Sequence, residues 1–257
     1  MMALKGFVKI SILTLLYAGA ALSQELTADE IIQRFNDLMT QPTVKSISKM
    51  TIMTSTGKQR NFIMESYSAD RGAKNLIKYI SPIRVKGQAI LMLNNADDIW
   101  VYFPHTNRVR KLATHAKKQK MEGSDFSYED MGAGDTWINE FESKRLEDEK
   151  IEGVDCYKIE LSKKPQSKSG YSKLIMWIDK SNFMAVRIDY YDEDDPDLHL
   201  KRLILSDVRD IDGIPTATRM VMTDIQDNTD TVMEYSEITY GADIPDELFT
   251  ERGMKTK

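Results

Sequence analysis

The side chains with the strongest intrinsic chemistry in this sequence are three histidines and one cysteine. His105, His115 and His199 lie in separate segments, without the spacing of a metal-binding motif such as HExxH or CxxC. The G-x-S-x-G motif of a nucleophile turn does not occur in the sequence either. A hydrolase would have to assemble its nucleophile and base from distant residues, which spacing does not reveal. We therefore predict that the protein is not an enzyme and uses no metal or cofactor.

Two charged runs have the composition of ion-binding or surface-binding segments. The acidic run at residues 192–197 offers carboxylates to calcium, but it lacks the glycine and closing glutamate of an EF-hand loop. We expect a solvated hairpin tip there. The three lysines of residues 117–120 have the charge to contact anionic lipid headgroups or an acidic partner, although such a cluster is also typical of a solvated loop. The net charge of −5 argues against a nucleic-acid partner, which would favour a basic face.

The first 23 residues have the pattern of an export signal. Lys5 and Lys9 precede an apolar stretch that is shorter than the roughly 20 residues a membrane-spanning helix needs. Small residues at positions 21 and 23 predict cleavage after Ser23. The single cysteine, Cys156, lies far from this site, so we expect a mature chain of residues 24–257 that is not lipid-anchored.

The mature chain begins with the pattern of a short helix. Thr27 and Glu30 have the spacing of a capping box, and Pro42 ends the helix. Apolar residues follow the cap at helical spacing, and they are Ile31, Ile32, Phe35, Leu38 and Met39.

Most of the remaining chain has the pattern of short strands separated by turns. The predicted strands are residues 44–54, 60–68, 75–80, 89–93, 99–103, 108–112, 142–150, 156–162, 173–179, 184–191, 200–208, 216–223 and 231–239. Turn residues recur about every ten positions, which is typical of an antiparallel meander that curls into a barrel or half-barrel. A last helical turn is predicted over residues 245–249.

Two strands alternate between apolar and polar residues, which predicts one buried and one wet face for each. In residues 157–162 the odd positions are apolar. In residues 184–189 the even positions, Met184, Val186 and Ile188, are apolar.

Other strands, such as residues 99–103 and 174–178, are apolar at both parities. Such strands must be covered on both faces or face a cavity on one. A sheet with few helices to fill its inner side needs large side chains or a ligand there. Several of the predicted strands also contain methionine, a flexible side chain that suits varied apolar partners as well as ordinary cores.

Residues 122–137 (EGSDFSYEDMGAGDTW) form the most unusual segment of the chain. Asp125 or Ser127 has the side chain to cap a short helix, and a glycine-rich stretch would end that helix or act as a hinge. The apolar side chains of the segment are Phe126, Tyr128 and Met131. Two roles fit this composition equally, a lid over the open end of a barrel and a capped structural connector.

The motifs of this segment and of later strands resemble a known family. GSDFSYEDM, CYKIEL, YSKLIMWIDK and IPDELFT occur in the order of the LolA-like family of outer membrane lipoprotein-sorting proteins, and the similarity covers nearly the whole mature chain. The resemblance implies a curved, incomplete antiparallel β-barrel with helices over an apolar cavity, and no catalytic residues. LolA-type carriers take acyl chains of lipoproteins from an inner-membrane transporter to an outer-membrane acceptor. This branch is also similar to proteins that work beside export pumps of the resistance-nodulation type.

We therefore predict a mainly β protein, a single LolA-like half-barrel over residues 24–257 with an N-terminal helix and short helical lid elements. It would act in the periplasm as a carrier of lipid or lipoprotein acyl chains between an inner-membrane transporter and an outer-membrane acceptor. The alternative is a periplasmic lipid-sensing regulator or accessory protein of a membrane transporter or signalling system. The predicted lid residues are Phe126, Tyr128 and Met131. The predicted cavity residues are Met50, Ile52, Ile63, Leu91, Leu93, Val101, Phe103, Met176, Ile178, Met220 and Met222.

Overall fold

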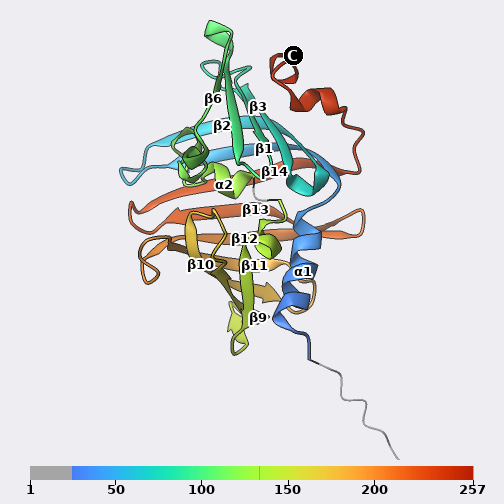
Figure 1. Ribbon diagram of the computed structural model, residues 1–257, viewed down its shortest axis with the longest axis vertical. Coiled ribbons are helices and arrows are strands. Elements are labelled where there is room, and N and C mark those ends of the chain that lie inside the picture. Colours follow the sequence, from blue (N-terminus) through green and yellow to red (C-terminus); the bar gives the residue numbers. More distant parts are fainter. Residues whose placement is uncertain (1–24, 133, 257) are drawn as a thin grey trace, which may run out of the picture.

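The computed structural model describes residues 25–132 and 134–256, which form one long antiparallel sheet with a helix inside its curve (Figure 1). The order along the sheet is β6-β5-β4-β3-β2-β1-β14-β13-β12-β11-β10-β9-β7, and β8 pairs with β9. Almost every strand therefore pairs with its neighbour in sequence. The exceptions are the pairing of β9 with β7 and the pairing of β1 with β14, which brings the first and last strands together in the middle of the sheet.

The strand bounds follow the predicted meander closely. The strands are β1 (Thr43–Met53), β2 (Gln59–Ala69), β3 (Lys74–Ser81), β4 (Ala89–Leu93), β5 (Asp98–Phe103), β6 (Arg108–Lys111), β7 (Phe141–Arg145), β8 (Glu149–Ile151), β9 (Val154–Lys163), β10 (Tyr171–Asp179), β11 (Ala185–Asp192), β12 (His199–Ile211), β13 (Ile214–Asp224) and β14 (Thr229–Tyr240). The single strand predicted over residues 142–150 is wrong, because the chain turns there and forms β7 and β8. The predicted architecture is confirmed as mainly β, an antiparallel sheet that curls into an incomplete barrel. Within the described residues, its edge strands β6 and β7 do not pair.

Helices are short and few beside this sheet. They are α1 (Ala28–Met39), α2 (Tyr128–Met131), α3 (Thr136–Asn139), η1 (Asp70–Gly72), η2 (Pro104–Thr106), η3 (Thr114–Lys118), η4 (Met121–Gly123), η5 (Asp246–Phe249) and η6 (Gly253–Lys255). None of the helices in the described part of the chain is long and apolar enough to cross a bilayer. The predicted export signal, residues 1–23, lies outside the described residues.

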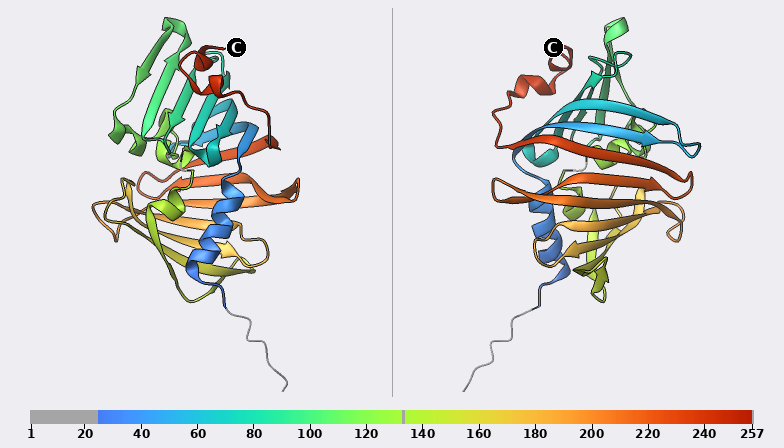
Figure 2. Two further views of the ribbon diagram at one scale, coloured as in Figure 1. Left: turned by 45° about the vertical axis from the view of Figure 1, so that its right-hand side comes forward. Right: turned by 180° about the vertical axis from the view of Figure 1, so that it is seen from behind.

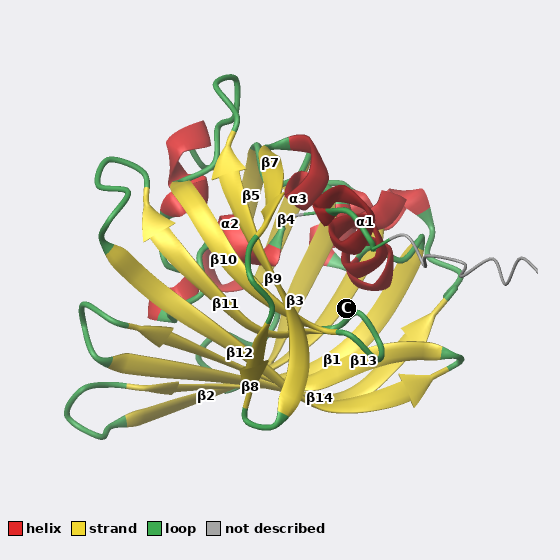
Figure 3. Ribbon diagram, turned by 90° about the horizontal axis from the view of Figure 1, so that it is seen from below, coloured by secondary structure: helices red, strands yellow, loops and turns green. Residues whose placement is uncertain are grey.

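Helix α1 lies on the concave side of the sheet (Figures 2 and 3). The predicted capping box is confirmed: the Glu30 backbone N–H donates to Thr27 Oγ1 at 3.2 Å, and the Thr27 N–H donates to Glu30 Oε2 at 2.8 Å. Ile31, Ile32 and Phe35 are fully buried against the sheet. The predicted apolar stripe therefore covers the concave face, as its helical spacing requires.

Side chains of the sheet separate into an inner and an outer set, since successive residues of a strand point to opposite faces. On β4, Ile90 and Met92 belong to the large inner core. Leu91 belongs to an outer cluster, where Phe249 and Met254 of the C-terminal segment cover it. The chain end thus returns to the convex face of the N-terminal half (Figure 2).

The alternation predicted for residues 184–189 is wrong at Val186. The pairing of β10 with β11 shifts between Trp177 and Ile178, where a β-bulge places an extra residue in β11. Ala185 and Ile188 therefore join the inner core, while Val186 packs in a convex cluster around the buried Cys156.

Candidate functional site

Two adjoining cavities lie between α1, the α2–α3 segment and the concave face of the sheet. The first, here called the hydroxyl cavity, has a volume of about 190 Å³, and the second, here called the apolar cavity, about 210 Å³. Each alone is small beside ligand sites of roughly 300–1,000 Å³, but together they reach the lower part of that range. Both are lined by Met39, Ser68, Asn75, Met131, Met220 and Tyr235.

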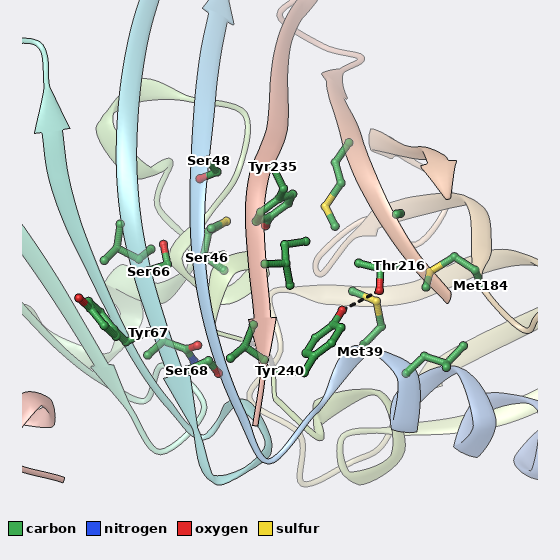
Figure 4. A pocket seen from close by; sticks show the side chains of 18 of the residues that line it. Met39, Ser46, Ser48, Ser66, Tyr67, Ser68, Met184, Thr216, Tyr235 and Tyr240 are labelled. Atoms are coloured by element: carbon green, nitrogen blue, oxygen red, sulfur yellow. Dashed lines mark hydrogen bonds between the residues drawn. The ribbon is translucent and has the colours of Figure 1, made fainter. Parts of the chain in front are cut away.

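The hydroxyl cavity forms where the strands carry small side chains (Figure 4). Ser46 and Ser48 of β1 lie on the same face at two-residue spacing, and Ser66 of β2 pairs directly with Ser46. Ser68 extends the row on β2 and pairs with Val44. Serine fills much less space than the methionine and phenylalanine at the far ends of these strands, so the concave surface is hollow here.

Aromatic and threonine hydroxyls from β13 and β14 complete this wall. Tyr240 OH and Thr216 Oγ1 lie 2.8 Å apart and share a hydrogen bond (Figure 4). Burial, and to a smaller extent the neighbouring Tyr240, raises the pKa of Tyr235 to about 12, so its phenol is neutral at physiological pH. Among the described residues that line this cavity, none carries a charge.

The apolar cavity lies beside α1 and the segment before α3. Its larger side chains are Phe35, Phe126, Trp137, Ile188, Leu203, Leu205 and Met222. Asp130 is the one charged residue among its described lining residues. This carboxylate binds protein partners: it accepts from the Ser127 N–H at 2.6 Å, from Tyr171 OH at 2.9 Å and from Lys201 Nζ.

The unusual segment is fixed to the sheet at several points by polar contacts. Ser127 caps α2, as predicted, and the Asp130 N–H donates to its hydroxyl at 3.2 Å. The buried Asp125 accepts from Thr229 Oγ1 at 2.6 Å and from Thr231 Oγ1 at 2.7 Å, which ties the segment to β14. The Asp130–Lys201 pair ties it to β12.

Two further carboxylates, one in α2 and one directly before α3, form hydrogen bonds with neighbouring segments. Glu129 accepts from the Gly170 N–H at 2.9 Å, and burial raises its pKa above the ordinary value. Asp135 accepts from Asn36 Nδ2 at 2.7 Å and contacts Arg71 at 3.2 Å. Burial alone would raise the pKa of Asp135, but the hydrogen bonds from Asn36 and Arg71 outweigh it and hold the pKa below its ordinary value.

Replacing Asp135 with asparagine is expected to make the fold less sensitive to acid. The pKa of Asp135 is lowered in the folded state. Its ionised carboxylate therefore stabilises the native state at pH values above the ordinary pKa of 3.8. That stabilisation is lost as the pH falls through the folded-state pKa. Thermal melts between about pH 6 and pH 3 should show a smaller loss of Tm for Asp135→Asn than for the wild type. An equal loss would contradict this role, and the exposed Asp155→Asn serves as control.

The structure places the predicted site residues in three groups. Met220, Met222, Phe126 and Met131 line one or both cavities. Other predicted residues fill the inner core around the cavities without lining them, and these are Met50, Val101, Phe103, Tyr128, Met176 and Ile178. Ile52 also belongs to this core and borders a separate small pocket near the β1–β2 turn.

The prediction is wrong for Ile63, Leu91 and Leu93. Ile63 is 39 % exposed, whereas its neighbours in β2, Phe62 and Met64, are buried in the inner core. Leu91 and Leu93 pack in the convex cluster under the C-terminal segment. A choice of the wrong parity moves every side chain of a strand to the other face, and this error explains all three cases.

The serines of the hydroxyl cavity were not predicted. Their signal was present as serine at every second position, in KSISK for β1 and ESYSA for β2. A search for large apolar residues passes over them, because a cavity opens where side chains are small.

The two charged runs meet at one ion pair, and the other lysines of the basic run pair with carboxylates elsewhere. Residues 192–197 form the hairpin tip expected between β11 and β12. A solvated loop, one of the two interpretations of the basic run, is wrong for Lys117. Its side chain is buried, and its Nζ lies 3.0 Å from the Asp97 carboxylate. Lys118 pairs with Glu193, and Lys120 lies 2.7 Å from Asp227. His105, His115 and His199 are not among the described residues that line either cavity.

Known proteins share this architecture. A structure from Vibrio parahaemolyticus, described as an outer membrane lipoprotein-sorting protein domain, superposes with a TM-score of 0.80 at 24% identity, covering 89% of this chain and 98% of that one. A DUF1329 family protein from Desulfovibrio piger gives 0.80 at 28% identity, covering 88% and 97%. A LolA superfamily protein from Nitrosomonas europaea gives 0.74 at 23% identity, covering 88% and 98%.

A protein-family model described as "-like: Uncharacterized protein" matches residues 71–256, most of the chain. The chain belongs to that family, and its fold is LolA-like. The resemblance predicted from the sequence motifs is thereby confirmed. No curated protein matches the sequence significantly. In this LolA-like fold, the two cavities are lined by residues of α1, of α2 and of the concave face of the sheet.

Proposed function

We propose that this LolA-like protein is a periplasmic carrier that binds a lipid, or the acyl chains of a lipoprotein, in the two concave cavities. It would receive its cargo from an inner-membrane transporter, such as one of the resistance-nodulation type, and pass it to an outer-membrane acceptor. The observation that carries this proposal is the shared methionine wall, Met39, Met131 and Met220, between two adjoining cavities. The export signal predicted over residues 1–23 supports the compartment.

The energetics of such a site suit a reversible carrier. Each methylene removed from water stabilises the complex by ~0.8 kcal/mol. About a dozen methylenes would therefore offset much of the roughly 4–15 kcal/mol that association costs. Methionine side chains adapt to chains of different shape, which favours a range of acyl cargoes over one rigid ligand.

In this proposal, the α2 segment is the wall that opens or closes the apolar cavity. Phe126 and Met131 contribute side chains to that cavity, while Asp125 and Asp130 fasten the segment to the sheet. Entry of a long chain would require a local movement of the end of α1, or of α2 after the contacts of Asp130 with Tyr171 and Lys201 break.

A displacement titration tests the proposal. Delipidated protein is mixed with a fluorescent acyl probe and then titrated with a diacylated lipopeptide and with the same peptide without acyl chains. We expect saturable probe binding that only the acylated peptide displaces. Failure of the probe and of the lipopeptide to bind at any accessible concentration would contradict the carrier function.

A further inference from the structure

The hydroxyl cavity has a chemical character that simple burial of acyl chains does not require. Ser46, Ser48, Ser66 and Ser68 form a compact group on two paired strands, with Tyr235 of β14 beside them (Figure 4). A purely apolar ligand would gain nothing from these hydroxyl groups. Their grouping on one wall therefore points to a ligand with polar atoms at a fixed place.

The hydrogen-bonding state of the serines supports this view. Ser46 is 8 % exposed and Ser48 is 3 % exposed, and both line the cavity. Within residues 25–132 and 134–256, the side-chain hydrogen bonds of this wall involve Thr216 and Tyr240, and none involves the four serine hydroxyls. Thr216 differs, since it donates to the Ile214 carbonyl and shares a hydrogen bond with Tyr240. Among the described residues, none of these four hydroxyl oxygens is fully enclosed without a partner, so they open onto the cavity, where water or the polar atoms of a ligand can form hydrogen bonds with them.

The charges around the cavity narrow the class of ligand. Its described lining residues include no cation that could neutralise a carboxylate or phosphate. Arg71, near the end of α1, is already bound to Asp37 at 2.8 Å and to Asp135 at 3.2 Å. Lys201 is bound to Asp130. An anionic headgroup placed among the serines would be desolvated without compensation, whereas a neutral carbonyl would accept their hydrogen bonds.

We infer that the hydroxyl cavity binds the ester carbonyls of a neutral diacylglyceryl unit, with the acyl chains extending into the adjoining apolar cavity. This inference rests on the proposed carrier function and adds the chemical group that the site recognises. The same unit occurs in free diacylglycerol and in a diacylated lipoprotein. Ser46 and Ser66, which face each other across β1 and β2, would donate to the carbonyls.

Three ligands with matched chains test the inference: dioleoylglycerol, its dioleyl diether analogue without carbonyls, and oleate. Each competes with a fluorescent acyl probe on the full chain. We expect the diester to bind about tenfold tighter than the diether, because two ordinary hydrogen bonds to its carbonyls would contribute that much. The diester should also bind tighter than oleate. In the Ser46→Ala/Ser66→Ala variant, this preference should fall to about twofold while diether affinity stays the same.

The matched control is Ser162→Ala/Ser206→Ala, on β9 and β12 and outside both cavities, which should keep the full preference. Thermal melts establish that both double variants fold. Equal binding of diester and diether to the wild type, or tighter binding of oleate, would overturn the inference and leave the carrier function standing. Retention of the full preference by Ser46→Ala/Ser66→Ala would overturn it in the same way. Failure of all three ligands to bind would overturn the carrier function as well.

Discussion

Replacing Met220 with lysine is expected to weaken acyl-probe binding by roughly a hundredfold or more while leaving the protein folded. Met220 lines both cavities and is only partly buried, so the longer side chain has room. An ammonium group there would have to lose its water when an acyl chain enters. Displacement titration gives the affinity, and near-ultraviolet circular dichroism shows whether tertiary packing is kept.

Two further variants separate cavity effects from general effects. Val208→Lys adds the same charge at a position that is 41 % exposed and outside both cavities, and it should bind the probe normally. Ser66→Met adds no charge but fills the hydroxyl cavity, and it should also reduce probe binding. Normal affinity in both Met220→Lys and Ser66→Met would place the ligand elsewhere.

The second large effect concerns the ion pair between Asp130 and Lys201. Their side chains are only 4 % and 9 % exposed, so Lys201→Met leaves a buried carboxylate without its cation. Breaking a buried pair in this way costs about 3–5 kcal/mol. Urea unfolding should show a decrease of this size in the free energy of unfolding. The expected loss is large because Asp130 also holds Ser127 and Tyr171.

The double variant Asp130→Leu/Lys201→Met should recover part of this loss, because it removes both charges. Lys150→Met is the exposed control: its pair with Asp155 has side chains that are 59 % and 68 % exposed. Such a pair contributes at most about 1 kcal/mol. If Lys201→Met costs no more than Lys150→Met, the α2 segment is not fastened by this ion pair.

The elements of the fold could be predicted because their signals are local. The capping box of Thr27 and Glu30 and the apolar spacing that follows it determine where α1 begins and which face it buries. Turn residues at regular intervals likewise separate the strands. These signals act over a few residues, so the bounds in the structure differ from the predicted ones by only one or two positions at most strands.

The cavity could be predicted only in part because its position depends on pairing between strands. Because β4 is apolar on both faces, its sequence does not show to which face Leu91 points. The C-terminal segment that covers Leu91 comes from far along the chain. The bulge that turns Val186 outward depends on the pairing of β11 with β10. Lys201 illustrates the same limit: its partner Asp130 is 71 positions away in sequence.

Native mass spectrometry of the protein purified from its own host would show directly whether the concave cavities carry lipid. We expect a co-purifying diacylated lipid or lipoprotein, identified after extraction, that is absent from Met220→Lys and present in Val208→Lys. A mass without ligand, with no uptake of added diacylglycerol or lipopeptide, would contradict the carrier function.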